Sequence, residues 1–271
     1  LGAVMERQAA LIARWQLVGF IHGVMNTDNM SIAGETIDYG PCAFMDSYHP
    51  DTVYSSIDRR GRYAYGNQPS IAQWNLAGLA NALLPLIADD QHAAVELATE
   101  LIQSFPARFA HYYKPGLLRK LGLASAQDGD LELAQDLLRR MAENRADFTL
   151  TFRGLGGLVD STSKEDASVR GLFEDPAAFD EWLLRWRSRI RGESRSPAEL
   201  RNDMRSVNPA FIPRNHGVEE AIEAAVEQGD LEPFEELVEV LASPYEDQPT
   251  RARYAAPPRP EQVVRETFCG T

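Results

Sequence analysis

The chain has 271 residues, of which 44% are hydrophobic and 25% charged, and its formal net charge is −13. This composition is that of an ordinary soluble globular protein, long enough to bury a core. The acidity argues against nucleic acid or another polyanion as a partner. Two cysteines, Cys42 and Cys269, are too few for a disulfide-rich scaffold or a four-cysteine zinc site, so we expect a cytoplasmic protein.

The first twenty residues predict an amphipathic helix. Apolar residues recur there at helical spacing, at Leu1, Val4, Met5, Leu11, Ile12, Trp15 and Val18. Glu6, Arg7 and Arg14 interrupt them, so this stretch is neither a signal peptide nor a membrane span. Because the chain opens on Leu1 and already reads as the middle of a folded protein, we expect it to begin downstream of the true N-terminus.

A loop rich in Gly, Asn and Asp follows at residues 22–46. Within it, residues 30–32 and 35–37 are expected to form two very short strands joined at Gly34, a small hairpin. Residues 41–69 carry many aromatic and charged side chains without a clear period. An irregular segment of this length usually is a functional loop.

From residue 70 onward the chain is expected to be mostly helical, so the fold class is mainly α with one small β-hairpin. The expected helices span residues 70–85, 92–105, 108–120, 130–144, 176–191, 197–205, 218–228 and 233–241. A polar loop is expected at residues 161–167, and a Pro-rich tail at residues 243–260 is expected to wrap the surface.

Several side chains carry separate expectations. Asp130 is a candidate N-cap, and Trp74 is expected in the core. Arg205 and Arg214 are expected to pair with acidic partners in the core. The four arginines Arg185, Arg187, Arg189 and Arg191 lie near Trp182 and Trp186. A solvated helix face is the favoured interpretation of this run, and a nucleic-acid surface is the alternative.

The informative stretch for chemistry is His22-Gly-Val-Met-Asn-Thr-Asp-Asn29, followed by Asp38-Tyr-Gly40. It places the oxygen-bearing side chains of Asp28, Asn29 and Asp38 in one tight loop. Mg²⁺ binds few protein oxygens and keeps water and phosphate oxygens as its other ligands. One carboxylate and one amide therefore suit a metal that also holds a nucleotide, and a second carboxylate suits acceptance of a proton from an incoming hydroxyl.

Protein kinases use the same logic, with a catalytic-loop Asp as base, a loop Asn on a metal, and the Asp of an Asp-Phe-Gly motif on a metal. Asp38-Tyr39-Gly40 looks like a variant of that last motif. The catalytic loop departs from the kinase pattern, because no Arg-Asp follows His22 and Asp28 abuts Asn29. An ordinary kinase is therefore disfavoured.

The stretch HGVMNTDNMSIAGETIDYGPCAFMD closely resembles the SelO family, also called YdiU. The resemblance continues through GRYAYGNQPSIAQWNLAGLANALLPL, NPAFIPRN and PFEELVEVLASPYEDQP to the closing FCGT. It spans nearly the whole chain, with several long motifs in the same order.

The resemblance implies a protein-kinase-like fold that transfers AMP from ATP to Ser, Thr or Tyr hydroxyls of proteins, with release of pyrophosphate. UMP transfer is also attributed to the family. Carried over by position, Asn29 and Asp38 would hold Mg²⁺ or Mn²⁺, and Asp28 would accept the proton. The Gly-rich loop, the strand lysine and most nucleotide contacts would lie upstream of Leu1, so we expect the chain alone to lack its N-terminal lobe and to be inactive or nearly so.

By the same resemblance, Cys269 matches a C-terminal cysteine that some relatives pair with a cysteine of the activation segment, where this chain has Tyr54. Cys42 is a candidate substitute partner in a redox pair, although two free thiols are the default. His22 is expected to be a buried, hydrogen-bonded structural residue, with a catalytic-loop anchor as the alternative. The run of arginines at residues 59–62 is either a contact for substrate protein or phosphate, or a solvated loop.

Two domains are expected: residues 1–160 as a kinase-like C-terminal lobe, and residues 161–271 as a helical extension with its tail. The favoured function is protein adenylyl transfer, with protein substrates and ATP as partners and no nucleic acid or membrane. A phosphotransferase on the same fold and a non-catalytic helical interaction module remain as alternatives.

Overall fold

The structure is a computed structural model that describes residues 1–160 and 163–268. These residues form a mainly helical protein with two strands of two residues each. The first elements are α1 (Gly2–Val18), β1 (Phe20–Ile21), η1 (Thr27–Asn29), β2 (Ala43–Phe44), η2 (Tyr65–Asn67), α2 (Gln68–Ile87), α3 (Gln91–Gln103) and α4 (Phe105–Lys120). They are followed by α5 (Asp130–Glu143), α6 (Phe148–Leu155), η3 (Gly156–Leu158), α7 (Ser163–Arg170), α8 (Pro176–Ile190), α9 (Pro197–Val207), α10 (Asn215–Glu223), η4 (Ala224–Gln228), α11 (Glu232–Leu241), η5 (Pro249–Ala255) and η6 (Pro260–Gln262).

The chain divides into two compact units. The first unit comprises Leu1–Cys42, Pro50–Gly116 and the residues from Glu266 on, and the second comprises Ala43–His49 and Leu117–Arg265. The domain boundary expected between residues 160 and 161 falls inside the second unit and stays a prediction.

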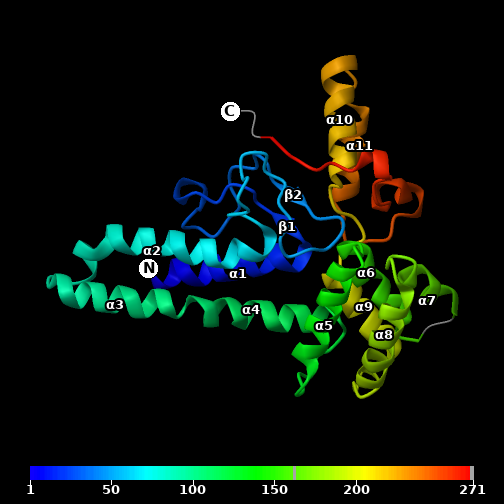
Figure 1. The fold of residues 1–271 in the computed structure, drawn as a ribbon, viewed down its shortest axis with the longest axis horizontal. Helices are drawn as coiled ribbons and strands as arrows, with labels where there is room; N and C mark the ends of the chain where they lie inside the picture. The colour runs from blue at the N-terminus through cyan, green and yellow to red at the C-terminus, as the bar shows by residue number, and fades with distance from the viewer. Residues whose placement is uncertain (161–162, 269–271) are drawn as a thin grey trace. The chain divides into compact units, whose positions relative to one another are not determined.

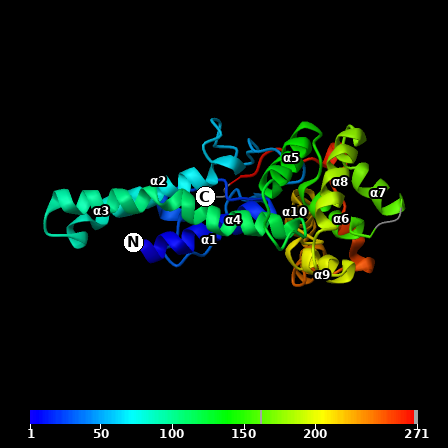
Figure 2. The ribbon, with the colours of Figure 1, turned by 90° about the horizontal axis from the view of Figure 1, so that it is seen from below.

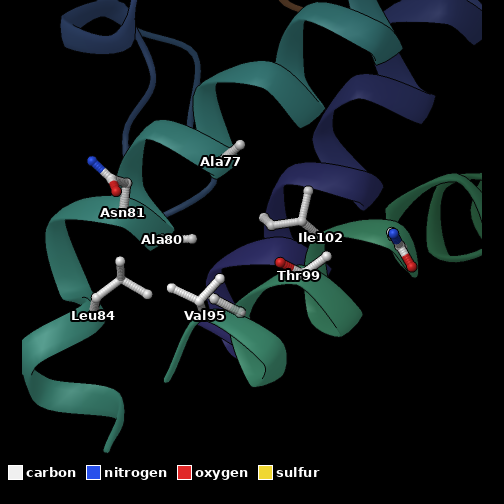
Figure 3. A pocket seen from close by; sticks show the side chains of 9 residues that line it. Ala77, Ala80, Asn81, Leu84, Val95, Thr99 and Ile102 are labelled. Carbon is white, nitrogen blue, oxygen red and sulfur yellow. The ribbon is translucent and has the colours of Figure 1, made fainter. Parts of the chain in front are cut away.

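The first unit is organised around α2, which packs against both α1 and α3 (Figure 1). Residues that face each other between α2 and α3 are small, among them Ala80 and Ala98, so the two helices approach closely. Nine uncharged residues line a hollow of about 230 Å³ between them, which Figure 3 shows from close by. The side chains that line this hollow include no ionisable acid or base.

In the second unit, α5 packs against α8, as both views of the ribbon show (Figures 1 and 2). Trp182 and Trp186 of α8 are fully buried, and their indole N–H groups donate to the carbonyls of Leu133 and Leu121, both at 2.9 Å. Their rings are therefore unavailable for stacking on bases, which removes the support for a nucleic-acid surface here.

Arg214 forms ion pairs with two segments of the second unit that are distant in sequence. The side chain is 2% exposed, and its Nη1 lies 2.5 Å from the carboxylates of both Asp46 and Asp147. Asp147 also caps α6 by accepting from the backbone N–H of Leu150 at 2.7 Å. The expectation of acidic partners in the core is confirmed for Arg214. Arg205 also has an acidic partner, Asp247 at 3.2 Å, but this pair is exposed, so its expected place in the core is wrong.

Four sequence-based expectations about the elements are wrong. Residues 30–37 form no strands but a turn and an extended stretch. Asp130 is the first residue of α5 rather than its cap, because Gly129 occupies the cap position and the Asp130 carboxylate instead binds Arg189 at 2.7 Å. Trp74 is 56% exposed, since it lies on the outer face of α2. The polar loop expected at residues 161–167 is helical from Ser163 on, and residues 161–162 lie outside the described part of the chain.

Candidate functional site

The candidate site lies in the first unit, in the loop that follows α1. Gly19 ends α1 with a left-handed backbone (φ 74°), which the absence of a side chain permits. The next residues are held by Gln68 at the start of α2: its Nε2 donates to the carbonyl of Phe20 at 2.9 Å, and its Oε1 accepts from the N–H of His22 at 3.0 Å. This role of Gln68 could not be predicted from the sequence, because a buried amide has no characteristic spacing.

His22 connects the two limbs of the loop. The residue is fully buried; its Nε2 lies 2.8 Å from the carbonyl of Ile37, and its Nδ1 accepts from the N–H of Val24 at 3.4 Å. Since a carbonyl can only accept, Nε2 carries the proton and the ring is neutral. Burial lowers the pKa of His22, although the bond to Ile37 and the negative charge of Asp38 oppose that shift. The expectation of a buried, hydrogen-bonded structural histidine is confirmed, and the role of His22 as an anchor of a catalytic loop stays a prediction.

Asp28 and Asn29 lie on the short 3₁₀ turn η1. The Asn29 side chain donates from Nδ2 to the carbonyl of Val24 at 3.1 Å, which leaves its Oδ1 as the atom that can bind a cation. The neighbouring Asn26 accepts from the hydroxyl of Tyr63 at 2.7 Å, so the irregular segment at residues 41–69 is tied to this turn. Asp28 is exposed, so its carboxylate is accessible from solvent.

The chain between Asn29 and Asp38 folds against α1 instead of pairing with itself. The N–H of Gly34 donates to the carbonyl of Ser31 at 3.0 Å, and the positive φ of 76° at Gly34 reverses the chain. Side chains of α1 take the place of a partner strand: Gln8 donates to the carbonyl of Ser31 at 2.6 Å, and Trp15 donates to the hydroxyl of Thr36 at 2.9 Å. The reversal returns the chain to Ile37, which contacts His22. The hairpin was expected to bring Asn29 and Asp38 to one cation, and that pairing stays a prediction.

Asp38 is exposed and has a left-handed backbone with a φ of 54°, which is uncommon for any residue except Gly. The pKa of Cys42 is raised mainly because the thiol is buried, and the nearby negative charge of Asp38 raises it further. Gly23 lies against the segment that follows Asp38, because a Cβ at Gly23 would lie only 2.9 Å from the carbonyl oxygen of Pro41. The close backbone approach holds the segment after His22 beside the segment after Asp38.

A series of hydrogen bonds connects the turn that carries Asp28 and Asn29 to the backbone beside Asp38. Hydrogen bonds run from the Asn29 side chain to Val24, from Val24 to His22, and from His22 to Ile37, the residue before Asp38. Within residues 1–160 and 163–268, no group of three His, Cys, Asp or Glu side chains is placed to hold a metal. The Oδ1 of Asn29 and the carboxylate of Asp38 are oxygen donors of the kind that Mg²⁺ accepts, and their binding of one cation stays a prediction.

Of the two cysteines, the structure describes Cys42. Cys42 is half-buried, has no disulfide partner among residues 1–160 and 163–268, and its Sγ lies 3.5 Å from the carbonyl oxygen of Tyr39. Its raised pKa keeps it protonated and therefore a poor nucleophile. Cys269 lies outside the described residues, so its pairing with Cys42 stays a prediction.

The end of the chain reaches the irregular segment at residues 41–69, which the sequence did not reveal. Thr267 donates from its N–H to the carbonyl of Tyr54 at 2.7 Å, and the N–H of Ser56 donates to the carbonyl of Thr267 at 3.1 Å. The Thr267 hydroxyl also donates to the carbonyl of Pro41 at 2.6 Å. In the same segment, the guanidinium of Arg62 lies 4.7 Å from the centre of the Trp74 ring, while Arg59 and Arg60 are exposed.

Comparison with known proteins defines the class. The family model for protein adenylyltransferase SelO matches residues 1–242, so the chain belongs to the SelO family. Two relatives are each named "Protein nucleotidyltransferase YdiU": one from Rhodopseudomonas palustris strain BisB18 is 61% identical over 99% of this chain, and one from Bradyrhizobium diazoefficiens is 59% identical over 100% of it. A third of the same name, from Nitrobacter winogradskyi, is 61% identical over 99% of the chain. The chain spans about half the length of these relatives, covering 54%, 55% and 53% of them.

No helix in the described part of the chain combines the length and the apolar character that a membrane crossing requires.

Proposed function

We propose that the protein containing this chain transfers AMP from ATP to hydroxyl groups of proteins and that this chain supplies the proton acceptor and the metal-binding residues. The observation that carries the proposal is the His22-centred set of hydrogen bonds, which joins the turn of Asp28 and Asn29 to the backbone next to Asp38. A chain that served only as a scaffold would have no need to connect the turn of Asp28 and Asn29 to the backbone before Asp38 through one buried imidazole.

In this proposal Asp28 orients the acceptor hydroxyl of a Ser, Thr or Tyr and takes its proton. The hydroxyl oxygen forms a bond to the α-phosphorus of ATP, and the bond from that phosphorus to the bridging oxygen breaks, so that pyrophosphate leaves. Asn29 and Asp38 would hold Mg²⁺ or Mn²⁺, which would neutralise charge on the phosphates. Hydrogen bonds from His22 and from side chains of α1 hold the backbone of this loop, which would keep the three side chains positioned for the transfer.

Labelled ATP given to the full-length protein and its protein substrates distinguishes the candidate reactions. AMP transfer labels protein from ATP carrying ³²P at the α position but not at the γ position, whereas a phosphotransferase gives the opposite result. α-Labelled UTP tests uridylyl transfer in the same way. The chain by itself is expected to give little or no label with any of them, because most nucleotide contacts are proposed to lie in the other half of the protein.

Asp28→Asn, Asn29→Ala and Asp38→Ala in the full-length protein are each expected to lower transfer by about 100-fold or more. Asp89→Ala removes an exposed carboxylate from the turn between α2 and α3 and is expected to change nothing. Unchanged transfer in Asp38→Ala would favour the scaffold interpretation instead.

A further inference from the structure

The hollow between α2 and α3 is an apolar groove within the first unit (Figure 3). Leu84 and Val95 line one end of the groove, and Ala77 and Ile102 line the other. Its volume of about 230 Å³ is below the range of small-molecule sites, so it suits one or two apolar side chains better than a whole ligand. Neither the family match nor the proposed transfer assigns a partner to it.

The walls of the groove are accessible from solvent. Val95 is 41% exposed, and Ala77 and Thr99 are exposed as well. Behind these walls lie two small buried residues, Ala80 and Ala98, which let the helices approach closely. An incoming apolar side chain can therefore contact the walls from outside.

A hydrogen bond between the two helices fixes their spacing. The side-chain amide of Gln73 on α2 donates to the carbonyl of Ile102 on α3 at 2.9 Å. The two helices also pack directly against each other. A groove that is already formed costs a partner less free energy of ordering than one that must first open.

The segment that contains the groove has no Lys or Arg. Residues 63–107 contain neither, and their one histidine is His92, whose Nε2 lies 3.4 Å from Glu96. The next arginine along the chain, Arg108, is paired with Glu6 of α1. The acids of this segment therefore have few positive neighbours to cancel their charge.

Two of these acids lie on α3 next to residues that line the groove. Glu96 directly follows Val95, Glu100 directly follows Thr99, and all four residues are exposed. An apolar groove edged by acids matches an amphipathic helix with an apolar face and flanking Lys or Arg side chains. The same acids disfavour a second copy of this chain as the partner, because like charges would face each other.

We propose that the groove between α2 and α3 binds a basic amphipathic helix of another protein. An apolar side chain of that helix lies between Leu84 and Val95, and its Lys or Arg side chains pair with Glu96 and Glu100. Salt weakens the ion pairs, so the complex is sensitive to ionic strength. The residues of the groove take no part in the proposed transfer, so this inference stands independently of it.

A designed peptide of about 15 residues is the probe, with leucines at helical spacing on one face and lysines on the other. In fluorescence anisotropy at about 0.15 M salt, we expect the full-length protein to bind it with a Kd of about 1–50 μM, and about tenfold more weakly at about 0.5 M salt. A version with glutamates in place of the lysines should not bind. A version of the same composition in shuffled order should bind at least about tenfold more weakly. Equal binding of the original and shuffled peptides would show attraction by net charge alone and would overturn the proposal.

Val95→Lys and Leu97→Lys form a matched pair of variants on α3. Each replaces an exposed apolar side chain, 41% and 49% exposed, with the same charge, but Val95 lines the groove and Leu97, two residues along the helix, points elsewhere. We expect Val95→Lys to weaken peptide binding at least about tenfold and Leu97→Lys by less than about twofold. Thr99→Lys, at another exposed wall residue, serves if Val95→Lys does not fold. Equal effects of the matched pair, or no effect of a folded wall variant, would contradict the site.

The chain spans about half the length of its relatives, so a segment from the rest of the longer protein is the alternative occupant of the groove. Thr99→Cys and Leu97→Cys in the full-length protein distinguish the two. We expect maleimide to label both positions at similar rates, measured at each site by peptide mass spectrometry. Protection of Thr99→Cys alone would show that the same protein covers its own groove, and the proposal would be wrong. None of these measurements involves ATP, so their failure leaves the proposed transfer untouched.

Discussion

At the scale of single residues, His22 shows how one buried side chain organises an exposed site. Replacing it with Phe keeps an aromatic ring beside Trp15, whose centroid lies 5.4 Å from that of His22, but removes both hydrogen bonds of the imidazole. The carbonyl of Ile37 then loses its partner. We expect His22→Phe to lower the free energy of unfolding by about 1–3 kcal/mol, measured by urea denaturation of the full-length protein.

The same variant should change the pH dependence of stability. Burial lowers the pKa of His22 in the folded state, so the unfolded state binds more protons as the pH falls through the ordinary value of 6.5. The contribution of neutral His22 to the free energy of unfolding is therefore lost as the pH falls below that value. Between neutral and mildly acidic pH, the free energy of unfolding of His22→Phe should fall less than that of the wild type. His92→Phe, at an exposed histidine of α3, is the control and should follow the wild type.

Lys120 is a second residue whose pKa is shifted by burial. It is 2% exposed, and burial lowers its pKa to about 7, while the rings of Phe152 and Phe148, with centroids 4.4 and 5.3 Å from its Nζ, favour the charged form. The unfolded state keeps an ordinary lysine pKa. Between about pH 7 and the unfolded value of 10.5 the unfolded chain binds more protons, so the stability of the wild type should rise with pH over this window.

Lys120→Met should remove that rise with pH, and it should raise the free energy of unfolding by about 1–4 kcal/mol at neutral pH and below. The measurement is the difference in urea midpoint between variant and wild type at several pH values from 6 to about 10. Lys114→Met changes an exposed lysine of the same helix and should show neither effect. A difference that is independent of pH would mean that Lys120 is charged throughout.

At the scale of elements, the contact between the turn at Gly34 and α1 replaces the expected hairpin. A Cβ on Gly34 would lie 2.5 Å from the Cβ of Arg7, and its φ is positive. Gly34→Ala should therefore combine backbone strain with a steric clash and lower the free energy of unfolding by about 2–4 kcal/mol. Gly129→Ala is the matched control, since Gly129 also has a positive φ of 90° but open space around it, and should cost about 1–2 kcal/mol.

The elements also show where sequence patterns were sufficient. The helices with strong apolar periodicity, such as α5 and α8, lie close to their expected ranges, because a helix is specified by its own buried stripe. The prediction of a hairpin was wrong because residues 30–37 form hydrogen bonds with Gln8 and Trp15 of α1. A local sequence pattern does not indicate such distant side chains.

The candidate site residues Asp28, Asn29 and Asp38 could be named from the sequence and stay predictions. The anchoring roles of Gln68 and of Asn75, whose side-chain amide donates to the carbonyl of Met25 at 2.9 Å, could not be predicted, because a buried amide that binds distant backbone has no local sequence pattern.

At the scale of the whole molecule, the pairing of Thr267 with the segment around Tyr54 joins residues more than two hundred positions apart. The contact lies within the first unit, and it also reaches Pro41, three residues after Asp38. Long-range pairing of this kind carries the entropy of closing a long loop, so it persists only where several hydrogen bonds form together. The bonds of Thr267 involve both its backbone and its hydroxyl, which makes this one residue a direct test.

Thr267→Pro removes the N–H that donates to Tyr54 and the hydroxyl that donates to Pro41, whereas Thr267→Ser keeps both donors. In hydrogen exchange of the full-length protein, we expect Thr267→Pro to speed exchange at the Ser56 amide about tenfold or more, because its acceptor, the carbonyl of Thr267, is no longer held in place. Thr267→Ser should exchange at the wild-type rate, and so should peptides from α5 in either variant. Equal exchange at Ser56 in both variants would show that the segment around Tyr54 is ordered without the tail, and that Pro41 and Asp38 do not depend on the end of the chain for their placement.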